Sequence, residues 1–248
     1  MTVLVLAGAA VAATVAPSAD SPPPVHFGFV PSSLPRSEPA PIRMAVAGKY
    51  RLEAVGAHFE ALQALRFEAD RHIALDLQGV PVCKGPGRDV RRDLDEMERL
   101  CGDAAIGHGD LTVEVAFAGE RMLPATSKMT VYNRGRVRGR AELLAFAYLP
   151  APITAALQIP IEIRRTDRGR IGWEARPSIP KIAGGSGWIS EYSLRIGKRF
   201  LSATCVGGKL ELHVVSNFTD GTSRNARLVH PCSVSKPDVR QQPVEPAR

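Results

Sequence analysis

The four cysteines of this 248-residue chain are the residues whose number and spacing point most directly to chemistry. An even number of cysteines predicts disulfides in a chain that leaves the cytoplasm, although four cysteines allow three different pairings. We predict the pairs Cys83–Cys101 and Cys205–Cys232, because each joins the cysteines that are nearest in sequence. The alternative is a zinc site of Cys205, His230 and Cys232, but the chain has no CxxC and no second histidine at ligand spacing. We therefore expect no metal and no cofactor.

Other reactive residue types do not form a known catalytic pattern. His108 and Asp110 lie two residues apart in GHGD, and Ser186 lies among glycines in IPKIAGGSGW. Neither stretch completes a nucleophile elbow or a phosphate-binding loop. A hydrolase whose site is assembled in space around His108 or Ser186 is an alternative that single residues do not establish. The residues favour a protein that is not an enzyme.

Four arginines, Arg134, Arg136, Arg138 and Arg140, occupy alternate positions in RGRVRGR. Successive side chains of a strand point to opposite faces, so an extended hairpin here would project all four guanidinium groups from one face. Such a row can hold phosphate or carboxylate groups, which makes an anionic cell-wall or surface polymer a candidate partner. The alternative is a solvated hairpin tip in which the two glycines of the motif supply the turns.

The net charge of +7 is a weaker argument for an acidic partner than it first looks. Arginine supplies 25 of the 32 basic residues, and such a skew is typical of GC-rich coding sequence. Few aromatic residues accompany the arginine row, although stacking on aromatic rings is typical of proteins that bind single-stranded nucleic acid. We therefore do not expect nucleic acid as a partner.

The beginning of the chain predicts export. Thr2–Ala16 is an apolar run without charge, which is too short for an ordinary transmembrane helix but suits the centre of a secretory signal peptide. We assign residues 1–19 to this signal peptide. The mature chain is then expected to be secreted or associated with the cell envelope, without a transmembrane segment.

Composition divides the remainder into three parts. Residues 20–41 are predicted to be an extended, disordered tether, because prolines are frequent there and each lacks the amide donor that a helix or sheet needs. Residues 235–248 are predicted to be a disordered tail for the same reason. Residues 42–234 form the expected single β-rich domain.

Alternation of apolar and polar residues predicts strands over most of this domain. The predicted strands are 42–52, 65–70, 73–77, 111–118, 128–134, 141–149, 157–165, 170–176, 189–196, 200–205, 209–218 and 223–230. A short helix or turn is predicted for 57–63. One clear helix is predicted at Val90–Cys101, because Val90, Leu94, Met97 and Cys101 fall on one helical face. Asp89 is its predicted N-cap.

These elements predict an all-β fold, an antiparallel β-sandwich with one short helix tethered by Cys83–Cys101. A partly closed barrel is the alternative. The function that we expect is that of a non-catalytic envelope or extracellular module. A carrier of an apolar ligand is a further alternative, in which strands such as Ala141–Leu149 would line a closed barrel interior. A carrier of that kind needs an apolar cavity of several hundred Å³.

Five motifs also suggest a family. They are GVPVC (79–83), CGDAAIGHG (101–109), IPKIAGGSG (179–187), FTDGT (218–222) and the closing PC (231–232). In these motifs the chain resembles a group of exported proteins of high-GC Gram-positive bacteria that have no assigned activity. The likeness covers about Leu65 to Ser233, and it implies a signal-bearing, disulfide-containing β-rich domain. The chain departs from that group in its long proline-rich segment and in having no basic residue before the apolar run.

Overall fold

The structure is a computed structural model, and it describes residues 25–50, 54–55, 58–59, 61–85, 93–118, 121–197 and 199–235. The predicted signal peptide, residues 20–24 of the predicted tether and residues 236–248 of the predicted tail lie outside the described residues. Among the described residues, no helix is both long enough and apolar enough to cross a membrane.

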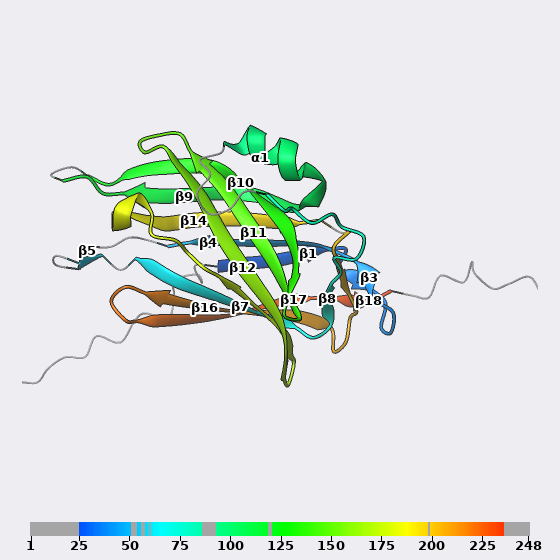
Figure 1. Cartoon of the computed structure of the whole chain (residues 1–248). Coiled ribbons are helices and arrows are strands. Elements are labelled where there is room, and N and C mark those ends of the chain that lie inside the picture. The colour runs from blue at the N-terminus through cyan, green and yellow to red at the C-terminus, as the bar shows by residue number, and fades with distance from the viewer. Residues whose placement is uncertain are drawn as a thin grey trace, which may run out of the picture.

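One large sheet contains most of the described chain (Figure 1). Its eleven strands among the described residues are, in spatial order, β1 (Val25–Val30), β4 (Arg43–Lys49), β14 (Gly187–Ile196), β9 (Ala105–Val115), β10 (Leu123–Val137), β11 (Arg140–Leu149), β12 (Ala155–Arg168), β13 (Ile171–Pro177), β7 (Leu62–Asp70), β16 (Lys209–Phe218) and β17 (Ser223–Pro231). Every neighbouring pair in this sheet is antiparallel. The all-β class with one short helix is therefore confirmed.

The sheet curls until its two edge strands, β1 and β17, approach each other (Figure 1). The two edge strands contact each other through side chains, because the ring centroids of Phe29 on β1 and His230 on β17 are 4.5 Å apart. Gly28 lies beside the same histidine, because a Cβ atom there would be 3.7 Å from the His230 ring. Of the two arrangements expected from the sequence, the protein therefore takes the partly closed barrel.

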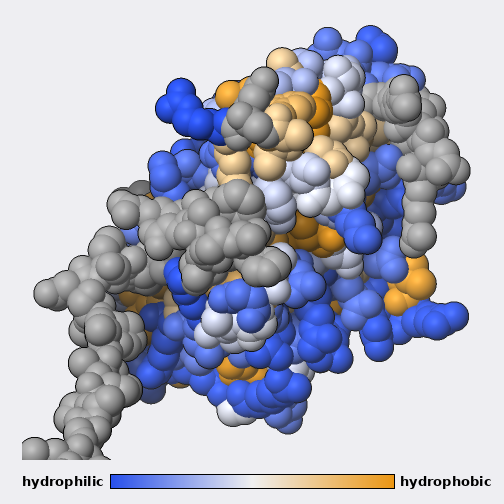
Figure 2. All heavy atoms as spheres, turned by 90° about the vertical axis from the view of Figure 1, so that its left-hand side faces the viewer, coloured by the Kyte–Doolittle hydropathy of each residue, from blue (hydrophilic) through white to orange (hydrophobic). Residues whose placement is uncertain are grey.

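Small sheets complete the fold. A three-stranded sheet of β3 (Ala40–Pro41), β15 (Leu201–Ala203) and β8 (Ile73–Leu75) lies at one end of the barrel (Figure 1). Two further pairs are β2 (Ser33–Leu34) with β18 (Ser233–Val234), which is parallel, and β5 (Ala54–Val55) with β6 (His58–Phe59). Figure 2 shows the opposite end of the barrel, where apolar residues gather in the upper part of the surface among polar ones.

Both predicted disulfides are present. Cys83–Cys101 holds the helix α1 (Leu94–Cys101) and the following 3₁₀ turn η1 (Gly102–Ala104) against the outside of the barrel. There a small apolar cluster buries Met97 beside Phe146 and Tyr132. Cys205–Cys232 joins the segment after β15 to the segment after β17.

The helix is shorter than its sequence pattern predicts. It begins at Leu94, and its N-cap is Asp93, whose carboxylate accepts a hydrogen bond of 2.8 Å from the amide of Glu96. Asp89 and Val90 lie outside the described residues. Both aspartates are good capping residues, and the pattern did not distinguish them.

Part of the predicted tether is folded. Within the predicted range 20–41, β1 pairs with β4 along its whole length, and Leu34 is fully buried. The reason is local: the segment Val25–Val30 contains no proline and carries apolar residues at alternate positions. An edge strand also pairs on one side only, so the neighbouring prolines interrupt no ladder.

Three buried carboxyl groups organise the outer face of the sheet on β7, β13 and β16. Asp70, Glu174 and Glu211 are 0, 1 and 2 % exposed. The cations around them are Arg164, Arg168 and Arg176 at Glu174, Lys209 and Arg227 at Glu211, and Arg170 between Asp70 and Glu211. Several arginines of this basic chain are therefore counter-ions of its own buried carboxylates.

Glu211 should make the stability of the fold depend on pH. Burial alone raises the pKa of Glu211, but its hydrogen bonds from Lys209 and Arg227 lower that pKa more, from 4.5 to about 2. A carboxyl group whose pKa is depressed by folding stabilises the protein fully above its unfolded pKa, and this stabilisation is lost as the pH falls toward the folded pKa. The free energy of unfolding should therefore decrease between pH 4.5 and pH 2.

Urea titrations at several pH values measure this decrease. Glu211→Gln should be less stable than the wild type at pH 7 and should show a flatter dependence on pH. The exposed Glu38→Gln is the matched control and should keep the wild-type dependence. Equal slopes for the wild type and Glu211→Gln would contradict the role given to this carboxylate.

The two disulfides should also contribute measurably to stability. Closing loops with sequence separations of 18 and 27 residues stabilises the fold by about 3 kcal/mol each in the chain-entropy model. We expect no reactive thiol in the native protein, and a loss of that order when Cys205 and Cys232 are both replaced by serine. Thiol titration and chemical denaturation measure the two quantities. Two or more reactive thiols in the native chain would show the pairing to be wrong in solution.

Candidate functional site

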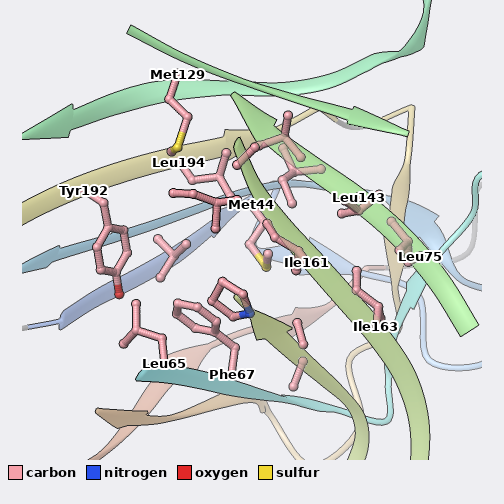
Figure 3. A pocket seen from close by; sticks show the side chains of 18 of the residues that line it. Met44, Leu65, Phe67, Leu75, Met129, Leu143, Ile161, Ile163, Tyr192 and Leu194 are labelled. Atoms are coloured by element: carbon pink, nitrogen blue, oxygen red, sulfur yellow. The ribbon is translucent and has the colours of Figure 1, made fainter. Parts of the chain in front are cut away.

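An apolar cavity of about 180 Å³ lies inside the barrel (Figure 3). Strands from around the barrel form its walls, and β8 and β15 of the three-stranded sheet line it at one end of the barrel. Every side chain that lines it is apolar, with Tyr192 and Trp173 adding one polar atom each. A ligand in this cavity would be surrounded by side chains of the barrel, which makes the cavity the candidate binding site.

Strand periodicity produces this lining. On β12, Ile159, Ile161 and Ile163 line the cavity, whereas the residues between them do not. On β7, Leu65, Phe67 and Ala69 follow the same rule. Because alternate side chains of a strand share a face, each strand contributes one apolar row to the interior.

Several inward-facing side chains are only partly buried. Met44, Phe67, Ile161, Ile163 and Leu194 line the cavity, yet each keeps an intermediate exposure. Figure 3 shows these side chains converging from strands on opposite sides. They are long apolar residues that have space in front of them, so this interior is less tightly filled than a typical protein core.

Aromatic rings gather at one side of the cavity. The rings of Phe67 and Tyr192 meet edge to face, with centroids 6.2 Å apart, and Tyr50 lies 6.3 Å from Tyr192 and 5.8 Å from Phe218. Gly48 makes room for this arrangement, because a Cβ atom at Gly48 would come within 2.6 Å of the Tyr192 ring. Gly48 is the strand partner of Tyr192, so an absent side chain on β4 allows the ring to lie across it.

The two tyrosine hydroxyls differ in their hydrogen bonds. The hydroxyls of Tyr50 and Ser216 are 2.9 Å apart and form a buried pair. The buried hydroxyl of Tyr192 has no hydrogen-bond partner among the described residues. Burial raises the pKa of Tyr192 far above its ordinary value, and the adjacent Tyr50 raises it further. Burial also raises the pKa of Tyr50, so both phenols keep their protons at neutral pH.

The predicted arginine row is divided by a turn and a bulge. The chain reverses at Arg138 and its neighbouring glycine, which both have positive φ, so Arg140 lies on β11 and Arg136 on β10. The sheet register shifts at Arg134, which donates a hydrogen bond of 3.3 Å to the carbonyl of Gly85. Arg140 pairs with Glu162 at 2.9 Å, and Arg136 and Arg138 are exposed at the tip. Their binding to an anionic polymer stays a prediction.

His108 and Ser186, the two residues around either of which a hydrolase site was expected, lie apart and do not act together. His108 is exposed on β9 with its Nδ1 atom 3.3 Å from the Thr130 hydroxyl, and Arg195 of β14 is its strand partner. Ser186 precedes the far end of β14, where Gly187 pairs with Val115. The carbonyl of Ser186 accepts a hydrogen bond from Ala116, which lies eight strand positions from His108. Eight positions correspond to roughly 25 Å. Asp110 does not bridge this distance, because it pairs with Lys128 at 2.6 Å.

The sulfurs of the alternative zinc site are bonded to each other in the disulfide Cys205–Cys232. In the part of the chain that the structure describes, no group of three or more histidine, cysteine, aspartate or glutamate residues is placed to hold a metal ion.

The cavity itself could not be located from the sequence. The strand Ala141–Leu149, named for the carrier alternative, does contribute Leu143 and Ala145 to the lining. The rows on β7, β12 and β13 that complete it could be assigned to an interior only once the sheet was known to curl.

Comparison of the chain with models of protein families, with curated proteins and with solved structures found no match.

The unpaired hydroxyl leads to a prediction about stability. Tyr192→Phe should leave the free energy of unfolding unchanged or raise it, because the variant removes a buried polar group that gains no hydrogen bond. Tyr50→Phe is the matched control: it should cost about 1 kcal/mol, because it leaves the Ser216 hydroxyl without its partner. Urea denaturation at pH 7 measures both. A Tyr192→Phe variant that loses as much stability as Tyr50→Phe would show that the Tyr192 hydroxyl is paired in solution.

Proposed function

We propose that this protein is an exported carrier that binds a small apolar molecule, or the apolar part of a larger one, inside its barrel. The observation that carries the proposal is the cavity of about 180 Å³ whose lining is apolar throughout. Apolar surface leaves water favourably, and a ligand in this space would also gain contacts with side chains that now face a gap.

The size of the cavity limits the ligand. Pockets for drug-sized molecules measure about 300–1,000 Å³, and the cavity is smaller than the several hundred Å³ that the sequence led us to require of a carrier. An engineered apolar cavity of about 150 Å³ nevertheless binds benzene. The fitting ligand is therefore a narrow molecule, such as a single hydrocarbon chain or one small ring.

Export is supported by the cysteine chemistry. Both pairs of cysteines are joined, and disulfides persist in oxidising surroundings outside the cytoplasm. A carrier in such a place would shield an apolar molecule from water during its transfer. The catalytic alternative has less support, because His108 and Ser186 are far apart along β14 and β9.

A substitution that fills the cavity tests the proposal. Ala175 lines the cavity on β13, and leucine at this position would occupy part of the space. The wild-type chain should bind toluene, an uncharged probe with one small ring, and Ala175→Leu should weaken this binding about tenfold or more, the scale on which apolar pockets discriminate added bulk. Isothermal titration calorimetry measures the affinity.

Ala45→Leu is the matched control, because Ala45 is an exposed residue on β4. This variant should bind the probe as the wild type does. Thermal unfolding of both variants checks that the fold is retained. If the wild type does not bind the probe, or if Ala175→Leu and Ala45→Leu bind it equally well, the cavity is not the binding site.

A further inference from the structure

The inward-facing row of β12 ends in a cation. Ile159, Ile161 and Ile163 line the cavity, and Arg165 occupies the next position of the same alternation. Its guanidinium carbon lies 4.9 Å from the ring centre of Trp173, its strand partner on β13. The face that lines the apolar interior therefore becomes cationic at this end of the strand.

A second arginine faces the same place. Arg71 directly follows β7, whose residues Phe67 and Ala69 line the cavity. Arg71 and Arg165 both line a surface depression of about 540 Å³, together with Thr166, Asp167, Gly172 and Trp173. The depression thus contains two guanidinium groups and one carboxylate, which leaves one positive charge in excess.

Trp173 connects the depression to the cavity, because its side chain lines both. A molecule that reached past this ring would have its apolar part among isoleucines and its other end beside two arginines. The pair of Arg71 with Asp167 does not block such a ligand. Its atoms are 3.1 Å apart, but the Asp167 side chain is 97 % exposed, and exposed pairs of this kind contribute little.

From this juxtaposition we infer that the ligand is an apolar acid, with its hydrocarbon tail in the cavity and its anionic head between Arg71 and Arg165. The inference rests on the proposed function and adds the class of ligand. Arginine suits the role, because its planar guanidinium can donate two parallel hydrogen bonds to a carboxylate or a phosphate. A head group buried in the cavity itself would instead lose its hydration without a cation to replace it.

Matched ligands test the head group. Dodecanoate, its uncharged methyl ester and dodecylamine have the same tail and differ in charge. Isothermal titration of the full chain should give the tightest binding for dodecanoate, with a loss of about thirtyfold for the ester, which loses the charge that both arginines hold. Dodecylamine should bind more weakly than the ester, because the depression repels a cation. Dodecyl phosphate in place of the carboxylate tells which anionic head is preferred.

Variants identify the residues. Arg165→Gln should weaken dodecanoate about tenfold, and Arg71→Gln should weaken it less, about threefold, because Asp167 already neutralises part of that charge. Neither variant should change the affinity for the methyl ester, which distinguishes a contact with the head from a merely structural role. Arg136→Gln is the matched control, since it removes the same charge from the exposed tip of the β10–β11 hairpin, and it should bind as the wild type does.

The orientation of the ligand can be measured with the two tryptophans of the chain. In a Trp188→Phe background, Trp173 is the remaining tryptophan, and its emission is observed by exciting at a wavelength that the four tyrosines do not absorb. A bromine atom quenches tryptophan fluorescence at short range, so 2-bromododecanoate should quench Trp173 more strongly than 12-bromododecanoate. The reverse order would place the tail, not the head, at the depression and would overturn the inference.

The results separate the two proposals. If the wild type binds neither dodecanoate nor its methyl ester, the proposed carrier function fails. If it binds both with equal affinity, and Arg165→Gln and Arg71→Gln leave that affinity unchanged, the carrier function stands and the acidic head group is wrong.

Discussion

The alternation of side chains along curved strands is the constraint on which this structure depends. Each strand that lines the cavity has an apolar row on its inner face, and these rows can leave water only by facing one another. Curling the sheet achieves this without a second sheet. The closure is made by rings, because Phe29 of β1 packs against His230 of β17 where the two edge strands meet. Exposed edges invite pairing with other chains, and this contact covers part of both edges.

The outer face follows a different rule. On β7, β13 and β16 the outward-facing positions carry charges, and Asp70, Glu174 and Glu211 are nearly inaccessible to water. A buried carboxylate without a counter-ion would be costly, so the arginines above them are part of the fold rather than a free basic surface. Many of the 32 basic residues are therefore no direct sign of a polyanion site, because several of the arginines that the structure describes neutralise carboxylates of the protein itself. This arrangement also separates Arg71 and Arg165, which face the depression beside Trp173, from the arginines around Glu174.

The proposed site combines both rules. Its walls are the apolar rows, which cross the interior without filling it, and its proposed charged end is the point where one row continues into Arg165. A carrier built in this way would need no loop or helix to recognise its ligand, because the sheet itself would place tail and head. The helix α1 lies on the outside of the barrel, where the disulfide Cys83–Cys101 attaches it. Its residue Met97 covers the outward-facing rings of Tyr132 and Phe146.

Much of this could be predicted from the sequence. The period of two located the strands from β9 onward, and the even number of cysteines with their short separations led to both disulfides, because these signals are local. Local signals also explain two wrong predictions. The prolines around Val25–Val30 indicated a disordered tether where the structure has an edge strand, and Asp89 was predicted as the N-cap of α1 although Asp93, an equally good capping residue, takes that position. Only the tertiary structure decided that the sheet curls into a barrel, that Tyr192 lies across Gly48, and that Trp173 stands between an apolar space and two arginines. The reason is physical: alternation along a strand states which residues share a face, but the curvature of the whole sheet determines what that face meets.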